Sequence, residues 1–329
     1  MTQKACRGHP LLHIDREGVV FITMNPEVTE LYAGLSGISL VPTTFDLGHG
    51  IQISQTYAHF MAPFLMAFKP PSPGKPHPAP WKSAKGGLAI DIAAELFLPL
   101  SYRPEDLDRL NTIWWIVALL RLKIGASVFV PVVSSERFSS IPSISEEPEL
   151  LPIEIHLNRL VPYGGSGPQL RADDLEWLKS HWEPGSQLLK NEDFSTAFIS
   201  VDSCLWNSNP ALALVMIWGA LERLFSTSHQ ELSFRVSANI ATFLEAPGRG
   251  RFTCFKRVKS LYDSRSRAAH GANLEAAEPF VETYALARRA LLKMIENRHV
   301  PTKNELEAAL FGDLIGIVGE TSGSTTKFQ

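Results

Sequence analysis

The pattern of hydrophobic and polar positions changes about halfway along the chain. In the first half, short runs of β-branched and aromatic residues are separated by glycines, which is typical of strands. Residues 87–100 place apolar side chains at every second position, the spacing of a half-buried strand. The apolar stretch 105–125 follows Pro104 and is long enough to be a helix. Further strands are expected at 18–24, 37–45, 50–57 and 151–157.

The second half has the 3.6-residue period of amphipathic helices. Residues 210–226 are apolar on most sides, which predicts a central helix, and the following segment repeats apolar residues one turn apart from Leu232 to Leu244. These features predict an all-α bundle of five or six helices. Its helices are expected at 172–182, 192–206, 210–226, 232–246, 250–270 and 273–299, with a short one at 302–313.

The two periods together predict an α+β protein with two domains. Gly, Ser and Pro cluster at 162–169, where the period changes, so the boundary is placed there. We expect a strand-rich mixed domain at 1–165, a helical bundle at 166–313 and a disordered tail at 314–329. The proline-dense segment 69–80 is expected to be a loop inside the first domain.

Composition and charge exclude several classes of protein. Hydrophobic residues make up 45% and charged residues 20% of the chain, as in folded soluble proteins. The net charge of −3 excludes a uniformly basic nucleic-acid-binding protein. Cys6, Cys204 and Cys254 have no metal-binding spacing, which favours a reducing, cytoplasmic compartment. No signal peptide is evident, and charged residues interrupt the apolar window 112–133, so no membrane span is expected.

The remaining local patterns give no cofactor or metal site. His49, His59 and His77 lack the spacing of zinc ligands, and the glycines of 162–169 lack the lysine of a phosphate-binding loop. Trp114 and Trp115 are expected in a core and not as a base-stacking surface. Cys204 and Cys254 lie among apolar residues and are expected to be core residues as well. We therefore expect neither a metal nor a cofactor.

A basic stretch in the second half departs from the overall charge. From Arg249 to Arg267 seven cations accompany one acid, Asp263, which gives a local charge of +6. Such a stretch suits a polyphosphate ligand, and it is also compatible with a solvated helix face. The cations are Arg249, Arg251, Lys256, Arg257, Lys259, Arg265 and Arg267.

Arg265 and His270 lie five residues apart at the end of this stretch. Histidine titrates near neutral pH and can act as base or acid, and arginine stays charged and can hold two phosphate oxygens. RNA cleavage without a metal needs such groups. The two positions are about 140° apart around a helix, so a long Arg side chain or a helix that opens at Gly271 is needed to bring both into one groove. Two pairs across a two-fold axis would supply a base, an acid and two cations. The alternative is a surface helix that ends at Gly271.

Glu222 is a carboxylate within an otherwise apolar helix. A carboxylate in such a place favours a cationic partner, and Arg265 and Arg267 are the candidates. The alternative is that Glu222 faces water and pairs with Arg223 or with nothing.

Three segments together resemble the HEPN superfamily, specifically its Apea-like branch of Arg-x4-His ribonucleases. The segment "ALVMIWGALERLF" contains Glu222, and "ELSFRVSANIATFL" follows it. The segment "RVKSLYDSRSRAAHG" then matches the signature of that branch, and the resemblance covers about 190–300. The matching residues are Leu261, Tyr262, Arg265, Ser266, His270 and Gly271.

The resemblance implies a helical bundle that forms a homodimer and cuts RNA without a metal, leaving cyclic or 3′-phosphate ends. It implies that His270 is the general base or acid, that Arg265 stabilises the scissile phosphate, and that Glu222 orients Arg265. Related proteins often act in bacterial defence or toxin-like systems. Residues expected to bind substrate are Ser266, Arg267, Lys259 and Asn239, the last of which is otherwise a satisfied helix amide.

Two other readings remain open from the residues. One is a non-catalytic HEPN module that binds RNA, a nucleotide or a partner protein, since the same residues bind phosphate without cutting. The other is a structural bundle with a solvated basic helix. The strand-rich domain has no assignable motif, and it would sense a trigger, bind a partner or restrain the nuclease.

Overall fold

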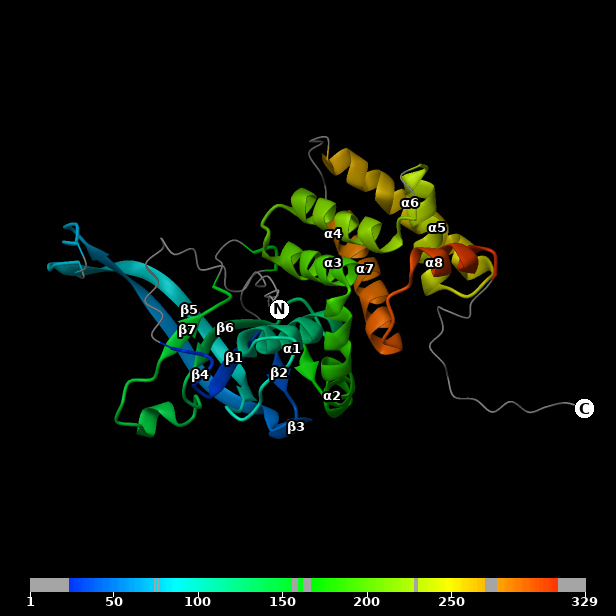
Figure 1. Cartoon of the computed structure of the whole chain (residues 1–329). Helices are drawn as coiled ribbons and strands as arrows, with labels where there is room; N and C mark the ends of the chain where they lie inside the picture. The colour runs from blue at the N-terminus through cyan, green and yellow to red at the C-terminus, as the bar shows by residue number, and fades with distance from the viewer. Residues whose placement is uncertain are drawn as a thin grey trace, which may run out of the picture. The chain divides into compact units, whose positions relative to one another are not determined.

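The computed structural model describes residues 24–73, 75, 77–155, 159–161, 167–227, 230–269 and 277–312 (Figure 1). An antiparallel sheet dominates the first half and helices dominate the second, so the fold class is α+β, as the change of period predicted. Residues 18–23 of the strand expected at 18–24, and the whole tail expected at 314–329, lie outside the described residues.

The chain divides into two compact units that alternate along the sequence. The first comprises Met1–Trp114, Ser127–Ile155 and Tyr163–Leu175, and the second comprises Trp115–Ala126, His156–Pro162 and Glu176–Gln329. Two of the divisions fall within helices, α1 (Arg109–Lys123) and α2 (Ala172–Ser186). The hydrophobic pattern suggested a single boundary after residue 165. It did not predict the alternation, because the period of a helix does not show in which unit each half of the helix packs.

The first unit is built on a six-stranded antiparallel sheet with the strand order β3-β4-β5-β1-β6-β7. The alternation at 87–100 belongs to β5, as expected, and its inward residues Ile92, Leu96 and Leu98 are fully buried. A short parallel pair joins β2 (Ser39–Leu40) to β8 (Gln169–Leu170), so the strand expected at 37–45 is interrupted. The six strands are β1 (Leu31–Ser36), β3 (Thr44–Gly48), β4 (Ile51–Ala67), β5 (Trp81–Leu98), β6 (Phe129–Ser134) and β7 (Leu150–Pro152).

Strands β4 and β5 form a hairpin much longer than the sequence suggested. The strand expected at 50–57 extends to Ala67, and its partner β5 begins at Trp81. The pairing continues from Gln52↔Phe97 to Ala67↔Trp81. Figure 1 shows this hairpin extending beyond the other strands of its unit. The proline-dense segment 69–80 connects the two strands, as predicted for a loop.

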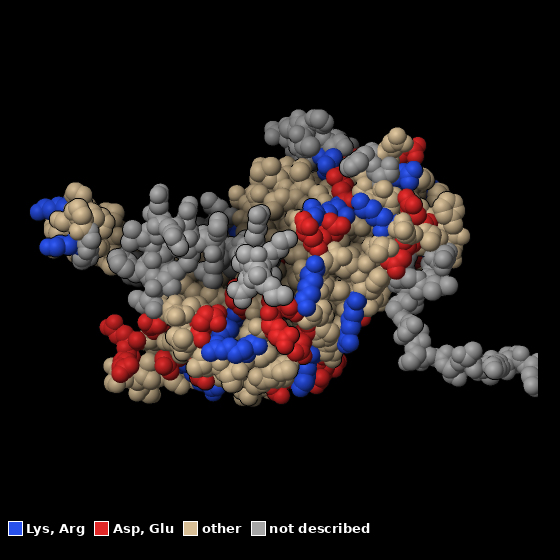
Figure 2. Space-filling view, in the orientation of Figure 1, with Lys and Arg blue, Asp and Glu red and all other residues tan. Residues whose placement is uncertain are grey.

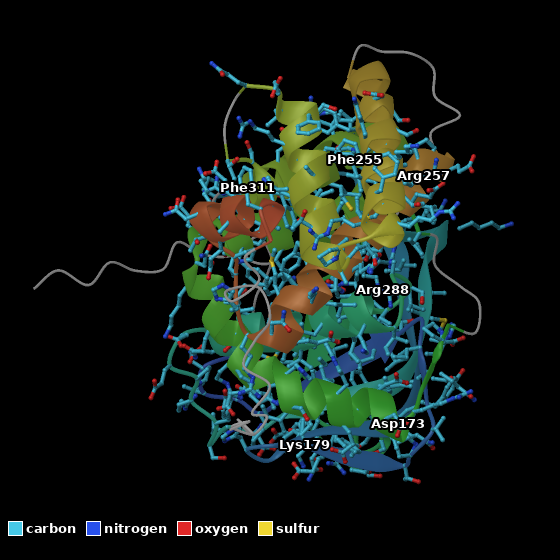
Figure 3. The ribbon with its side chains drawn as sticks, turned by 90° about the vertical axis from the view of Figure 1, so that its right-hand side faces the viewer. Asp173, Lys179, Phe255, Arg257, Arg288 and Phe311 are labelled. Atoms are coloured by element: carbon cyan, nitrogen blue, oxygen red, sulfur yellow. The ribbon has the colours of Figure 1, made fainter. Side chains whose placement is uncertain are left out.

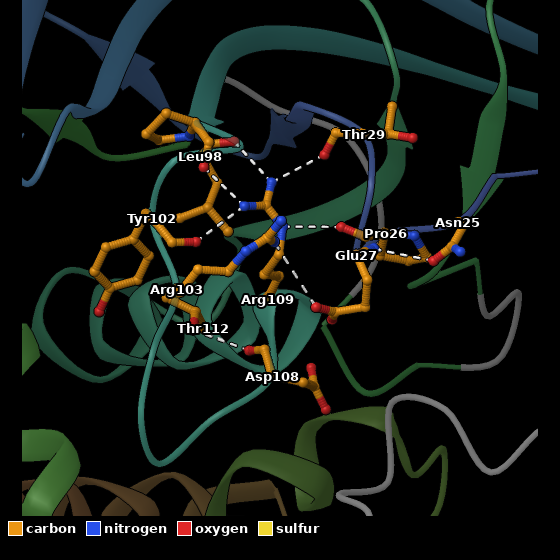
Figure 4. A network of polar contacts seen from close by, with 11 residues as sticks. Asn25, Pro26, Glu27, Thr29, Leu98, Tyr102, Arg103, Asp108, Arg109 and Thr112 are labelled. Atoms are coloured by element: carbon orange, nitrogen blue, oxygen red, sulfur yellow. Dashed lines mark hydrogen bonds and ion pairs between the residues drawn. The ribbon is translucent and has the colours of Figure 1, made fainter.

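A buried arginine fixes the end of β5 to the start of α1. Arg109 is 1% exposed and donates five hydrogen bonds, all to backbone carbonyl oxygens (Figure 4). These bonds satisfy every N–H of the planar guanidinium, which is how a buried charge is tolerated. The acceptors are Pro26, Thr29, Leu98, Pro99 and Tyr102.

The second unit contains the helices expected from the 3.6-residue period. Their starts follow local sequence signals: the side chain of Asn209 caps α4 ahead of Pro210, and Thr302 with Glu305 forms a capping box on α8. The helices after α2 are α3 (Glu192–Ser203), α4 (Pro210–Phe225), α5 (Leu232–Leu244), α6 (Arg249–Ala269), α7 (Ala277–Asn297) and α8 (Lys303–Leu310).

Helix α4 is central in its unit, as its apolar sequence predicted. It contacts α3, α5, α6 and α7. Trp218 and Phe225 on α4 are fully buried, and Phe225 packs against Phe243 of α5 at a ring distance of 5.5 Å. Burial of the large aromatic side chains supplies most of the apolar stabilisation of a helical core.

An ion pair is buried in the same unit. Arg121 on α1 donates to the carboxylate of Asp202 on α3 at 2.7 Å, and the two side chains are 1% and 9% exposed. The neighbouring Cys204 is fully buried, and burial, followed by the charge of Asp202, raises the pKa of its thiol. A thiol with a raised pKa is a poor nucleophile, consistent with a core residue. No helix among the described residues combines the length and the apolar character needed to cross a membrane.

Candidate functional site

Helices α4 and α6 bring three polar side chains of the predicted site region together. Glu222 lies one turn after Trp218 on α4, and Tyr262 and Arg265 lie three residues apart on α6, so they share one face of that helix. The side chains of Glu222 and Arg265 are 20% and 29% exposed. Trp218, Glu222, Tyr262 and Arg265 are called the Glu222 cluster below.

The carboxylate of Glu222 receives two donors. An Nη atom of Arg265 lies 3.2 Å from Oε1 of Glu222, and the hydroxyl of Tyr262 donates to the same oxygen at 2.8 Å. The guanidinium of Arg265 also lies 5.5 Å from the ring centre of Tyr262, and Trp218 meets that ring edge-on at 4.9 Å. The expected ion pair of Glu222 is therefore confirmed, with Arg265 as the cation.

The alternative partner, Arg223, is engaged elsewhere. Its guanidinium lies 2.9 Å from Asp193 and 3.2 Å from Glu192, both in the first turn of α3. Adjacent residues on a helix point about 100° apart, so Glu222 faces α6 while Arg223 faces α3. The reading in which Glu222 pairs with Arg223 is wrong.

Tyr262 is the polar member of the cluster that the sequence reading missed. The resemblance named it as a matching residue without assigning it a role; it is 6% exposed, and its hydroxyl donates to Glu222. Burial, then the hydrogen bond and the charge of Glu222, raise the pKa of Tyr262 to about 12. The hydroxyl is therefore neutral and a donor at physiological pH. The sequence did contain one signal for this contact: Tyr262 lies three residues before Arg265, and this spacing places both side chains on one face of the helix.

Arg265 keeps unused hydrogen-bonding capacity. Its Nε atom is buried and has no acceptor within the part of the chain that the structure describes. Its bonds to Glu222 all use one Nη atom. The buried Nε cannot reach a ligand, but the side chain is 29% exposed, so an N–H of its rigid fork that faces away from Glu222 can bind an anionic oxygen.

Asn239 does not line an open cleft. Its side chain is fully buried, and its amide Nδ2 donates at 2.8 Å to the carbonyl oxygen of Phe225, at the end of α4. The residue thus joins α5 to one of the otherwise unpaired carbonyls of α4. This corrects the expectation that Asn239 binds substrate, because a fully buried amide cannot reach a ligand.

The basic stretch does not form one patch around Arg265. Arg257 pairs with Glu282 of α7, and Arg251 donates to the backbone oxygen of Glu245. Lys259 is exposed, but it lies six residues from Arg265 and so about 120° around the helix. Because each residue advances by about 100°, a run of cations on a helix is distributed over several faces. Figure 3 shows Arg257 and Phe255 on different sides of α6.

The structure does not describe His270, the predicted partner of Arg265 in the Arg-x4-His pair. His270 and Gly271 lie outside the described residues. Helix α6 includes Ser266 and Arg267, but their side chains are not described. The joint geometry of Arg265 and His270 therefore stays a prediction.

A groove of about 670 Å³ is lined mainly by residues of α6 and α7, and no residue of the Glu222 cluster lines it. Its lining includes the apolar side chains of Val258 and Leu261 and the cations Arg249, Arg257 and Arg289. The last two arginines are paired with Glu282 and Glu245, at 2.8 Å in the second case. Paired arginines attract an anion less strongly than free ones, so the groove is a weaker anion site than its composition suggests.

The histidines of the first half have separate partners. His59 pairs with Asp91 at 2.7 Å, and the ring of His77 meets Trp81 edge-on at 6.2 Å. No group of three or more His, Cys, Asp or Glu side chains that could hold a metal is found among the described residues.

Comparison with known proteins adds no relationship. No protein-family model, curated protein or solved structure matches the chain.

Proposed function

We propose that the helical unit is a HEPN-type endoribonuclease domain that cuts RNA without a metal. The observation that supports this most is the Glu222–Arg265 ion pair, with Oε1 and Nη 3.2 Å apart. The sequence resemblance assigns Glu222 the task of orienting Arg265, and these two residues, 43 positions apart, are in contact. The remaining support is the Arg-x4-His spacing of Arg265 and His270.

The proposed chemistry is an internal phosphoryl transfer. The 2′-oxygen of one nucleotide attacks the adjacent phosphorus, and the bond from phosphorus to the 5′-oxygen of the next nucleotide breaks. The products are a 2′,3′-cyclic phosphate and a 5′-hydroxyl. His270 accepts the proton of the 2′-hydroxyl or donates one to the leaving 5′-oxygen, and a second copy of His270 across a homodimer takes the other role.

Arg265 stabilises the negative charge that develops on the phosphate. Glu222 and Tyr262 act through Arg265 and are positioning residues. Because the guanidinium is already held at Glu222, less rotational freedom is lost when the phosphate binds. Ser266, Arg267 and Lys259 are proposed to contact the RNA backbone. The protein is proposed to act in the cytoplasm, in bacterial defence or a toxin-like role, with the strand-rich unit as sensor, partner-binding part or restraint.

The test is cleavage of total tRNA by the purified full chain in excess EDTA. Arg265→Ala and His270→Ala are compared with the matched control Arg257→Ala, which removes an ion-paired arginine from the same helix. Wild type and Arg257→Ala should cleave and leave cyclic or 3′-phosphate ends. The other two should lose at least about a hundredfold in rate. Equal cleavage by all four proteins would identify a contaminant and refute the assignment.

The role of Glu222 has its own test. If Arg265→Ala cleaves poorly, added guanidinium should restore part of the rate by occupying the vacated place beside Glu222. In the double variant Glu222→Gln/Arg265→Ala, the rescue should be much weaker, because no carboxylate holds the cation. Equal rescue in both variants would show that Glu222 has only a structural role.

A second candidate is a non-catalytic module that binds RNA, a nucleotide or a partner protein. It is favoured by the exposed side chains of Arg249 and Lys259, neither of which has an ion-pair partner among the described residues. This candidate predicts RNA binding by wild type with no new phosphate ends, and weaker binding after Lys259→Ala.

A further inference from the structure

The outer part of the β4–β5 hairpin exposes many large apolar side chains. Strand β1 pairs with β5 only as far as Ala94, and β3 pairs with β4 only as far as Ser54. Beyond these points, within the described residues, β4 and β5 pair only with each other. We call residues 61–89 the arm. Its exposed apolar residues are 47–67% accessible and comprise Met61, Phe64, Leu65, Met66, Phe68 and Trp81.

All the charged residues of the arm are cations. The sequence has no acidic residue between Asp46 and Asp91, whereas it has four lysines in the arm. All four are exposed, and none has an ion-pair or cation–π partner among the described residues. Figure 2 shows Lys and Arg atoms, and no Asp or Glu atoms, at the outer end of the hairpin. The lysines are Lys69, Lys75, Lys82 and Lys85.

Cross-strand pairing places the exposed side chains of the arm on its two faces. Met66 and Lys82 are cross-strand partners and therefore lie on one face, and Ala67 and Trp81 lie on the other. The ring of His77 in the connection meets Trp81 edge-on at 6.2 Å. A two-stranded ribbon with both faces open is marginally stable in water by itself, so a bound partner would stabilise it.

We propose that the arm binds single-stranded nucleic acid. Such a strand carries one phosphate and one base ring per nucleotide, and the arm offers both exposed lysines and the exposed rings of Phe64, Phe68 and Trp81. A lipid bilayer fits less well, because Lys75 and His77 lie in the outermost connection and would enter the apolar layer first. A duplex fits less well too, because its bases are already stacked on one another.

The inference does not depend on cleavage at the Glu222 cluster. Oligothymidylate of about 20 nucleotides is therefore the probe, since it has no 2′-hydroxyl and cannot be cut by the proposed chemistry. Binding to the full chain in EDTA is measured by fluorescence anisotropy over a range of salt concentrations. Trp81→Ala should weaken binding at least about fivefold by removing a stacking surface. Lys75→Ala/Lys82→Ala should lower the salt slope by about 1.4, that is, 0.7 for each phosphate contact.

The matched control is Lys179→Ala/Lys303→Ala, which removes two exposed lysines from α2 and α8 (Figure 3 labels Lys179) and should leave the slope unchanged. Because the arm residues are exposed, all variants should keep the wild-type circular dichroism spectrum. Equal binding by wild type and both arm variants overturns the proposal, as does the absence of binding. Tighter binding to a duplex of the same length, or to phosphatidylserine vesicles in place of the oligonucleotide, also overturns it.

Discussion

The Glu222–Arg265 pair should contribute measurably to the stability of the helical unit. The perturbation is a double-mutant cycle made of Glu222→Ala, Arg265→Ala and the double variant. At 3.2 Å the Coulomb attraction is about 5 kcal/mol for an effective dielectric constant of about 20, before desolvation and side-chain entropy are subtracted. Exposed pairs retain roughly 0.2–1 kcal/mol. Because both side chains are less than a third exposed, we expect a coupling of about 1–2 kcal/mol.

The two single variants should lose different amounts of unfolding free energy. Glu222→Ala leaves both Arg265 and the hydroxyl of Tyr262 without their acceptor, so it should cost about 2–3 kcal/mol of unfolding free energy. Arg265→Ala leaves Glu222 with its bond from Tyr262, so it should cost about 1–2 kcal/mol. Glu222→Ala should cost more than Arg265→Ala because one carboxylate accepts from two donors.

The assay is urea unfolding of the full chain followed by far-ultraviolet circular dichroism, which reports mainly on the helices. The control is the same cycle on Arg257 and Glu282, where the side chains are 54% and 33% exposed and the coupling should be only about 0.2–1 kcal/mol. A Glu222–Arg265 coupling no larger than that of the control, or a larger cost for Arg265→Ala than for Glu222→Ala, would refute the geometry of the cluster.

Three further predictions follow from buried polar groups. Tyr262→Phe should remove an ionisation near pH 12 from the ultraviolet titration. Folding raises this pKa from about 10, so the folded protein holds the proton more tightly than the unfolded chain. The free energy of unfolding of wild type relative to Tyr262→Phe should therefore be highest below pH 10 and fall as the pH rises toward 12. Arg109→Lys should lower the urea midpoint of the strand-rich unit, costing about 3–5 kcal/mol, because Lys has three donors for five acceptor bonds. Asp202→Ala should cost about 3–5 kcal/mol by removing the carboxylate that pairs with the buried Arg121, and Asp202→Ala/Arg121→Met should recover part of this loss in the same assay.

The periodicity of the sequence was sufficient to predict the class of fold and the central position of α4 in its unit. A period of two or of 3.6 residues records which face of an element is buried, and that information is local. The need of Glu222 for a cation was also local, because a carboxylate in an apolar helix must be compensated wherever the helix packs.

The tertiary structure decided which groups meet. The sequence left both Arg265 and Arg267 as partners for Glu222, and it did not assign the hydroxyl of Tyr262 to that carboxylate. It left open one basic patch, which the rotation of α6 distributes over several faces, and a substrate-binding role for Asn239, which packing buries completely. The sequence also did not predict the length of the β4–β5 hairpin, because the residues of one strand do not show which residues of the other strand pair with them near the proline-dense connection. Each of these outcomes depends on contacts between elements, and a one-dimensional pattern specifies the buried face of an element without specifying the residue that lies opposite it.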